Sequence, residues 1–182
     1  MQHFDRATLE AGVDEIRNSP KDAGRVELIC RRPETEQREV LDEAVLDTGQ
    51  GLLGDNWSTR GSSSTEDGSS NPLMQLTLMN ARSAVLIAGE PERRQLAGDQ
   101  FFVDFDLSVV NIPPGTRLKL GEATIEITEI PHRGCGKFSS RFGVDALKFV
   151  NSGVGRELNL RGVNARIVEG GVVRVGDPIV KV

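Results

Sequence analysis

The spacing of apolar residues divides the chain into a helical start and a long series of short strands. Leu9, Val13 and Ile16 recur at the spacing of one helix face. Asp5 stands where the first turn of such a helix needs a cap. We therefore expect residues 1–24 to form a helical extension.

After this extension the apolar positions alternate, which is typical of half-buried strands. Val26, Leu28 and Cys30 share the apolar side of the first strand, so Cys30 is expected to be a buried core thiol. Val40 and Val45 are the expected anchors of the second strand. The same alternation predicts strands at residues 37–46, 73–79, 101–105, 117–120, 123–130, 163–168, 171–175 and 179–182. Short helices are expected at residues 80–88, capped by Asn80, and at 144–150. Short strands joined by Gly and Pro turns indicate a mainly β fold, a closed or partly open barrel with a few short helices.

A polar stretch at residues 54–72 interrupts the strands. It is rich in serine and glycine, so a flexible loop is expected, either a functional lid or a surface insertion without a role. Its beginning is a better candidate for ligand contact, because an exposed tryptophan beside charged residues needs a partner. The candidate residues there are Asp55, Asn56, Trp57 and Arg60.

Composition and charge narrow the classes of function. The chain of 182 residues is 37% hydrophobic, enough for the core of one main domain. Its formal net charge of −5 argues against binding nucleic acid or a membrane surface, so an anion site has to be built from locally gathered basic residues. Two cysteines do not make a disulfide scaffold, and no apolar run approaches the roughly 20 residues of a membrane span. We expect a cytoplasmic protein with reduced thiols.

The segment PHRGCGKFSSRF, residues 131–142, concentrates the reactive side chains. Gly134 and Gly136 flank Cys135 and allow another group to approach its sulfur. The surrounding basic residues should favour the thiolate, the form that attacks sulfur, carries a persulfide or binds a soft metal. His132 is expected either to orient a ligand or act as a base, or to be a turn residue.

Other polar residues are candidates for holding an anionic ligand. Arg161 precedes a late strand, where it is either a bidentate phosphate contact or a solvated charge. Asp99 and Asp177 are expected to be structural turn residues. A zinc site is not expected, because the two histidines and two cysteines cannot supply three ligands once Cys30 is in the core. The remaining candidates are Arg133, Lys137, Ser139 and Asn164.

Several fragments flank the cysteine segment in a distinctive order. They are GLLGD at 51–55, LAGD at 96–99, PGTRLKLG at 114–121, RGVNA at 161–165 and VGDPI at 175–179. In this order they resemble the MOSC family, named for the C-terminal domain of molybdenum cofactor sulfurases. The resemblance implies a barrel of the MOSC and pyruvate kinase type over residues 25–182, with Cys135 as the family's single cysteine.

The resemblance also implies functions. Cys135 would carry sulfur or ligate the molybdenum of a pterin cofactor, and Arg133, Lys137 and Arg161 would be phosphate or pterin contacts. We therefore expect a stand-alone MOSC domain that binds this cofactor or carries persulfide sulfur on Cys135 for metal–sulfur cofactor assembly. Its partner would be a separate cysteine desulfurase or an electron-transfer protein, and no pyridoxal phosphate is expected in this chain. Many relatives have proline directly before the cysteine, so Gly134 here predicts a looser loop.

Two alternatives remain open. One is a molybdenum-dependent reductase of N-hydroxylated substrates, with Trp57 in a lid over the substrate. The other is a binding module without turnover, in which the loop anchors a partner protein. The sequence leaves open whether the chain is an enzyme. The two enzyme classes considered are a sulfurtransferase and a molybdenum-dependent oxidoreductase.

Overall fold

The centre of the protein is a closed β-barrel, seen in a computed structural model that describes residues 3–182. Its seven strands are β1 (Ala23–Arg31), β5 (Leu76–Asn80), β6 (Phe101–Asp104), β7 (Arg117–Leu120), β8 (Ala123–Ile127), β9 (Val163–Glu169) and β11 (Pro178–Lys181). Around the barrel the order is β11-β7-β8-β9-β5-β6-β1, and β11 pairs with β1 to close it. The parallel pair β5–β6 interrupts an otherwise antiparallel arrangement. The predicted mainly β barrel with a few short helices is therefore confirmed.

The strand predicted at residues 37–46 is in fact two strands that belong to different sheets. β2 (Glu39–Leu41) pairs with β1, whereas β3 (Glu43–Asp47) joins β4 (Gly51–Leu52) and β10 (Gly171–Arg174) in a three-stranded sheet. The expected anchors were wrong, because Val40 is 53% exposed and Val45 is 41% exposed. Ala44 and Leu46 face the core instead, since alternate residues of a strand point to opposite faces.

Both faces of β1 are buried, in two separate apolar clusters. Val26 and Ile29 face the inside of the barrel, whereas Leu28 and Cys30 lie outside it, beneath the helices. The register of β1 against β6 shifts between Val26 and Leu28, so these two residues, which would share a face in a regular strand, point to opposite faces. The prediction that Val26 shares a side with Cys30 was therefore wrong. Cys30 is nevertheless a fully buried core thiol, as predicted.

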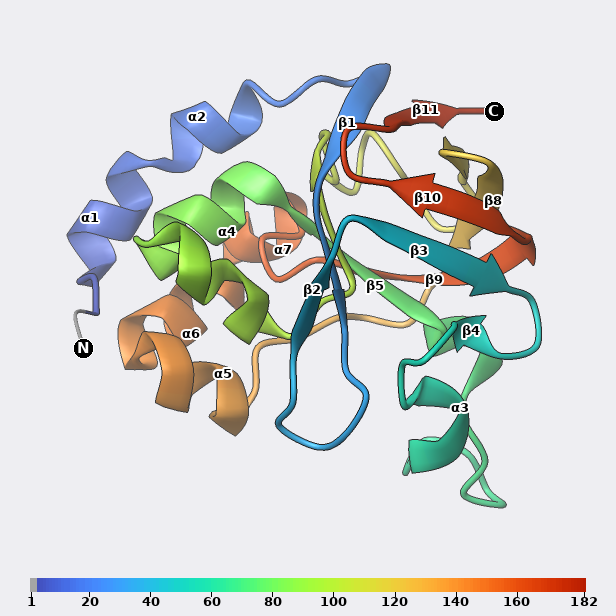
Figure 1. The fold of residues 1–182 in the computed structure, drawn as a ribbon. Helices are drawn as coiled ribbons and strands as arrows, with labels where there is room; N and C mark the ends of the chain where they lie inside the picture. Colours follow the sequence, from blue (N-terminus) through green and yellow to red (C-terminus); the bar gives the residue numbers. More distant parts are fainter. Residues whose placement is uncertain (1–2) are drawn as a thin grey trace.

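Helices cover the outer apolar cluster on one side of the barrel (Figure 1). They are α1 (Arg6–Ala11), α2 (Val13–Arg17), α4 (Ala81–Ala88), η2 (Pro91–Ala97), α5 (Gly136–Phe142), α6 (Val144–Val150) and α7 (Gly153–Glu157). Asp5 caps α1 and Asn80 caps α4, as predicted, each by accepting a backbone N–H three residues later. The sequence predicted one N-terminal helix, but the structure has α1 and α2, which are separated at Gly12. A Cβ at Gly12 would lie 2.5 Å from the Leu86 side chain of α4.

The polar stretch at residues 54–72 contains the short helix α3 (Trp57–Arg60) and ends at η1 (Pro72–Met74). Trp57 is only 6% exposed, so its predicted exposure was wrong. Its ring lies 3.0 Å from where Gly51 would carry a Cβ, and the positive φ of Gly51 brings the chain over the indole. The flexibility expected of residues 61–71 stays a prediction.

None of the helices formed by residues 3–182 combines the length and the apolar character that crossing a bilayer requires.

Candidate functional site

Cys135 lies at the start of a helix that the sequence did not predict. It is the N-cap residue of α5 and is exposed, in contrast to Cys30. Gly134 is tied to α6, because its N–H donates to Asn151 Oδ1 at 3.0 Å and its carbonyl accepts from Asn151 Nδ2 at 3.1 Å. These bonds fix Gly134 in this structure, and the looser loop expected in comparison with proline-bearing relatives stays a prediction. A Cβ at Gly134 would lie 2.9 Å from two α6 side chains, so glycine is what allows this close packing.

Helix α5 directs two cations toward a carboxylate in the loop between β1 and β2. Lys137 Nζ lies 2.8 Å from Glu36 Oε1, and Arg141 Nη2 donates to Glu36 Oε2. Hydrogen bonds from these two cations lower the pKa of Glu36 to about 2. Arg141 also donates through Nη1 to the Leu96 carbonyl at 2.9 Å, which fixes its guanidinium against η2. The Cys135 helix is thus joined to the β1–β2 loop.

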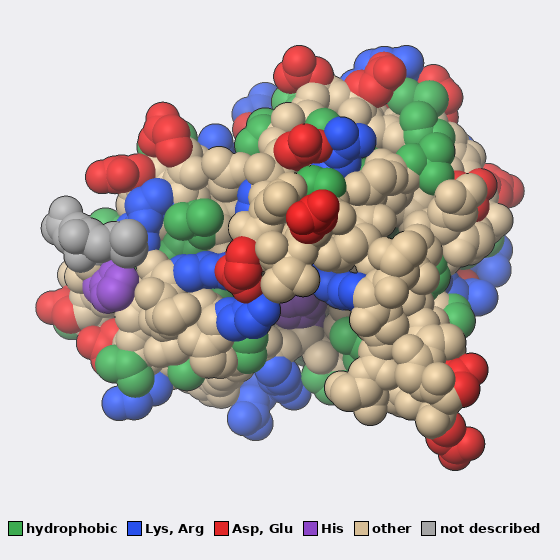
Figure 2. Space-filling view, turned by 60° about the horizontal axis from the view of Figure 1, so that its bottom comes forward, with side chains coloured by type: hydrophobic (Ala, Val, Ile, Leu, Met, Phe, Trp, Pro, Cys, Tyr) green, Lys and Arg blue, Asp and Glu red, His purple; other side chains and the backbone are tan. Residues whose placement is uncertain are grey.

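Glu36 and Lys137 border a cavity of about 210 Å³, here named the basic pocket. Its lining residues are Arg32, Glu34, Thr35, Glu36, Arg38, Asn56, Arg60 and Lys137. Four cations therefore face two carboxylates, although the chain as a whole carries a net charge of −5. Figure 2, which turns the bottom of Figure 1 forward, shows Lys and Arg side chains gathered about the middle of this face, with Asp and Glu among them.

The cations of the basic pocket are not fully neutralised by the protein. Burial, followed by the nearby charges of Arg141 and Arg32, lowers the pKa of Arg38. Burial and the charge of Arg32 lower the pKa of Arg60 in the same way. Arg38 Nε and Asn56 Oδ1 are buried without a hydrogen-bond partner among the described residues. Buried polar atoms of this kind are costly unless a ligand or water satisfies them.

Arg32, which lines the basic pocket, forms a buried ion pair with Asp55. Asp55 accepts from Arg32 through Nε and Nη2, both at 2.9 Å, and from the Arg32 backbone N–H at 2.8 Å. It also accepts the backbone N–H of Trp57 at 3.0 Å. Asp55, predicted to contact a ligand, is therefore engaged in holding Arg32. Sequence reasoning missed Arg32, which stands at the end of an apolar strand without a motif around it.

A second polar cluster lies beneath the segment that leads to Cys135. Arg161 Nη1 lies 2.5 Å from Asp99 Oδ2, and His132 Nε2 lies 3.6 Å from Asp99 Oδ1. Asn164 Nδ2 donates to the Ile130 carbonyl at 3.0 Å. Burial, followed by the charges of Arg161 and Arg32, lowers the pKa of His132 well below 6.5, so its imidazole is neutral. Burial raises the pKa of Asp99, and Arg161 opposes that change.

Asp99 does more than the turn role expected of it, because it is fully buried, forms an ion pair with Arg161 and lies 3.6 Å from His132. Asp99 Oδ1, Arg161 Nε and Asn164 Oδ1 lack hydrogen-bond partners among residues 3–182. His132 and Asn164 also line a second cavity of about 250 Å³, together with Arg133.

The structure thus divides the predicted site residues among several places. Asn56, Arg60 and Lys137 line the basic pocket. His132, Arg161 and Asn164 belong to the buried cluster. The other predicted site residues lie elsewhere. Arg133 lines the second cavity, and Ser139 lies within α5, where its backbone N–H donates to the Cys135 carbonyl. Asp55 is bonded to Arg32, and Trp57 is buried in the core. Arg32, Arg38 and Glu36 were missed, and only their clustering in space distinguishes them from ordinary surface charges.

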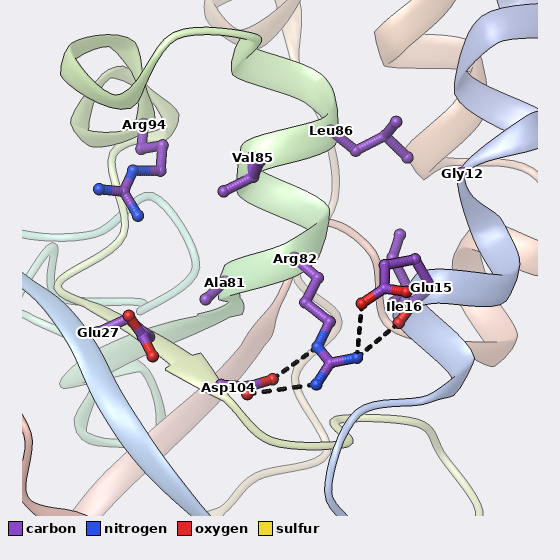
Figure 3. A pocket seen from close by; sticks show the side chains of 10 residues that line it. All are labelled: Gly12, Glu15, Ile16, Glu27, Ala81, Arg82, Val85, Leu86, Arg94 and Asp104. Carbon is purple, nitrogen blue, oxygen red and sulfur yellow. Dashed lines mark hydrogen bonds and ion pairs between the residues drawn. The ribbon is translucent and has the colours of Figure 1, made fainter.

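An apolar groove between α2 and α4 forms a further cavity of about 370 Å³ (Figure 3). Arg82 at its edge already bonds Asp104 at 2.8 Å and Glu15 at 2.9 Å. The groove offers no nucleophile, so the chemistry of this chain is better sought around Cys135. Within residues 3–182 no group of three His, Cys, Asp or Glu side chains is arranged to hold a metal ion.

Solved structures share this architecture. YuaD from Bacillus subtilis aligns over 86% of this chain and 94% of its own, with a TM-score of 0.59 and 16% identity. YiiM from Escherichia coli aligns over 87% of this chain and 69% of its own, with a TM-score of 0.56 and 19% identity. YiiM from Geobacillus stearothermophilus aligns over 90% and 74%, with a TM-score of 0.53 and 11% identity. The fold is MOSC-type.

The similarity to these solved structures lies in the fold, and comparison of the sequence with known families adds no support to it. No family model and no curated protein matches the sequence. At these identities the shared architecture defines the fold alone, so the activity of this chain has to be argued from its own residues.

Proposed function

We propose that this MOSC-type protein binds a phosphate-bearing anion in the basic pocket and performs sulfur or molybdenum chemistry at Cys135. The observation that supports it is the placement of the exposed thiol on α5, the helix whose Lys137 reaches the basic pocket. A reactive group and an anion-binding surface therefore share one short element. Arginine and lysine donors recognise phosphate oxygens by charge-assisted hydrogen bonds.

The residues present fit a molybdenum–pterin cofactor. The basic pocket supplies donors, including the unpartnered Nε of Arg38, for a ligand that carries only acceptors on its phosphate. Arg38, Arg60 and Lys137 would hold the phosphate, and Cys135 would supply a soft sulfur ligand, which suits a thiophilic metal. When bound, the cofactor would supply a redox-active metal for oxygen-atom or sulfur transfer.

Cys135 fits the persulfide route as well. The thiolate attacks the outer sulfur of a persulfide on a donor protein, such as a cysteine desulfurase. A new S–S bond forms at Cys135, the donor's S–S bond breaks, and the donor leaves as a thiolate. This step needs an accessible sulfur, which Cys135 has and the buried Cys30 lacks.

The burial of Trp57 removes the support that the reductase alternative drew from it. A ring that is 6% exposed and packed over Gly51 is not available as a lid over a substrate. It likewise offers no surface to a partner protein. Cofactor loading or persulfide transfer at Cys135 is therefore preferred over a reductase with a tryptophan lid and over a passive binding module.

The test is metal, pterin and persulfide analysis of the protein from a molybdenum-replete host, beside a Cys135→Ala variant. Ser140→Ala is the matched control, because Ser140 is exposed on the same helix and donates only to the Lys137 carbonyl. Stoichiometric molybdenum and pterin that only Cys135→Ala loses would support cofactor ligation. A persulfide on Cys135 without molybdenum would support the sulfur carrier. Absence of molybdenum, pterin and persulfide from the unaltered protein refutes the proposal.

A further inference from the structure

Of the two carboxylates that line the basic pocket, Glu36 is the one that forms ion pairs. Its two oxygens bond Lys137 and Arg141, which α5 presents from more than one hundred positions later in the chain. Glu34 lines the same pocket but accepts from Gln37 Nε2 at 3.2 Å within its own loop. The two carboxylates therefore differ in role: Glu36 closes onto α5, whereas Glu34 remains within the β1–β2 loop.

The contacts of Glu36 are suited to being released. The pair with Lys137 is held only weakly, because Glu36 is 56% exposed and Lys137 is 66% exposed, whereas Arg141 is 17% exposed. The backbone of Glu36 adopts φ +66°, a left-handed conformation that is uncommon for a residue with a side chain. Such a conformation persists where surrounding contacts hold it, so losing the two ion pairs would favour rearrangement of the loop.

The pocket has donors that Glu36 does not satisfy. Arg38 Nε and Asn56 Oδ1 lack partners among the described residues, and Arg60 is bordered by other cations. A carboxylate carries one negative charge and two oxygens. A phosphate group brings up to two charges and three free oxygens, so it can bond Lys137 and Arg141 and reach Arg38 as well.

We propose that Glu36 is an internal anion that occupies the basic pocket and that a ligand's phosphate group displaces it from Lys137 and Arg141, releasing the β1–β2 loop. This inference rests on the proposed function for the existence of an anion site, and it adds how that site is controlled. An internal competitor lowers the apparent affinity by the fraction of molecules in which the pocket is open. The pocket then remains closed to weakly bound anions at low concentration.

The test is a calorimetric titration of the purified protein with inorganic phosphate, at a pH above the second ionisation of phosphate. Glu36→Gln should bind phosphate about fivefold more tightly than the unaltered protein, because the competing charge is gone. Glu34→Gln removes the same charge from the same pocket without breaking an ion pair, and should change the affinity by less than about twofold. Arg38→Gln should abolish phosphate binding in both backgrounds.

Hydrogen exchange of the β1–β2 loop supplies a second readout that a simple change of net charge does not produce. Saturating phosphate should speed exchange of the amides of residues 34–38 in the unaltered protein, and Glu36→Gln should show the fast exchange without phosphate. Equal gains in affinity for Glu36→Gln and Glu34→Gln overturn the proposal, as does a complete lack of phosphate binding or loop exchange that phosphate does not alter.

The source of the phosphate is distinguished by repeating the titration on protein carrying the molybdenum–pterin cofactor. Loss of phosphate binding there assigns the pocket to the cofactor's own phosphate, and retained binding assigns it to a free phosphate ester. Both results keep Glu36 as the displaced anion. The proposed function is judged separately by the content of metal, pterin and persulfide, so Glu36 displacement without any chemistry at Cys135 would support this inference and refute that function.

Discussion

The ion pair between Arg32 and Asp55 is the feature whose removal has the clearest consequence for stability. Asp55→Ala deletes a fully buried carboxylate that accepts three N–H groups of Arg32 and the backbone N–H of Trp57. The Arg32 side chain, 9% exposed, would keep only the bond from Nη1 to the Gly98 carbonyl at 3.2 Å. The variant therefore leaves a buried guanidinium without its counter-charge.

Breaking one partner of a buried pair costs about 3–5 kcal/mol, because the remaining charge stays desolvated. The lower end applies here, since Arg32 borders the basic pocket and water can reach part of it. A loss of about 3 kcal/mol in the free energy of unfolding lowers the Tm of a chain of this size by about 6–12 °C. The exposed ion pair between Arg6 and Glu10, at 2.6 Å, serves as the comparison. Glu10→Ala should lower the free energy of unfolding by only about 0–1 kcal/mol.

Urea unfolding followed by circular dichroism measures these differences. The double variant Arg32→Met with Asp55→Leu removes both charges, so it should be more stable than Asp55→Ala alone. The reasoning would be refuted by a loss below about 1 kcal/mol for Asp55→Ala. It would also be refuted by a double variant that is no more stable than the single one.

Three further predictions concern the cysteine segment and the core beneath it. Gly134→Ala should lower the free energy of unfolding by about 1 kcal/mol in urea unfolding, because its Cβ would lie 2.9 Å from two α6 side chains. Gly136→Ala, whose Cβ would meet nothing within 4 Å, should stay within about 0.5 kcal/mol, and equal losses would contradict the packing argument. Burial and nearby arginines lower the pKa of His132 well below 6.5, so below pH 6.5 the unfolded chain takes up a proton there that the folded protein does not. The free energy of unfolding should therefore fall as the pH drops below 6.5. In unfolding measured as a function of pH, His132→Gln should flatten that slope. An alkylating reagent should label Cys135 in the folded protein and spare Cys30, because Cys30 is buried and its burial raises the pKa of the thiol to about 12. If mass spectrometry finds both cysteines labelled at similar rates, the exposed Cys135 and buried Cys30 of this structure are contradicted.

Local patterns in the sequence identified most of the strands and the helix caps. The alternation of residues 123–130 predicted β8, and the side chains of Asp5 and Asn80 cap their helices as expected. These features depend on neighbours within a few positions, so the order of residues is enough to determine them. The exposure of Cys135 and the burial of Cys30 followed in the same way from the polarity of their surroundings.

Helix α5 shows where local patterns are insufficient. Its sequence GKFSSRF contains glycine and two serines, which favour a loop. Phe138 and Phe142 make it helical, because they lie one turn apart with ring centroids at 4.9 Å and are both buried in the outer cluster. Trp57 was misjudged for the same reason, since its burial depends on Gly51 and not on the polar residues beside it.

The candidate site itself was decided by tertiary structure. The sequence alone determined a barrel of short strands, an exposed thiol on a basic segment and a buried second cysteine. It could not determine that Glu36 meets Lys137, or that His132 and Arg161 both meet Asp99. These partners are far apart in the chain, and their meeting depends on the closure and register of the barrel. Register is fixed by the packing of both apolar clusters at once, and no local run of residues carries that information.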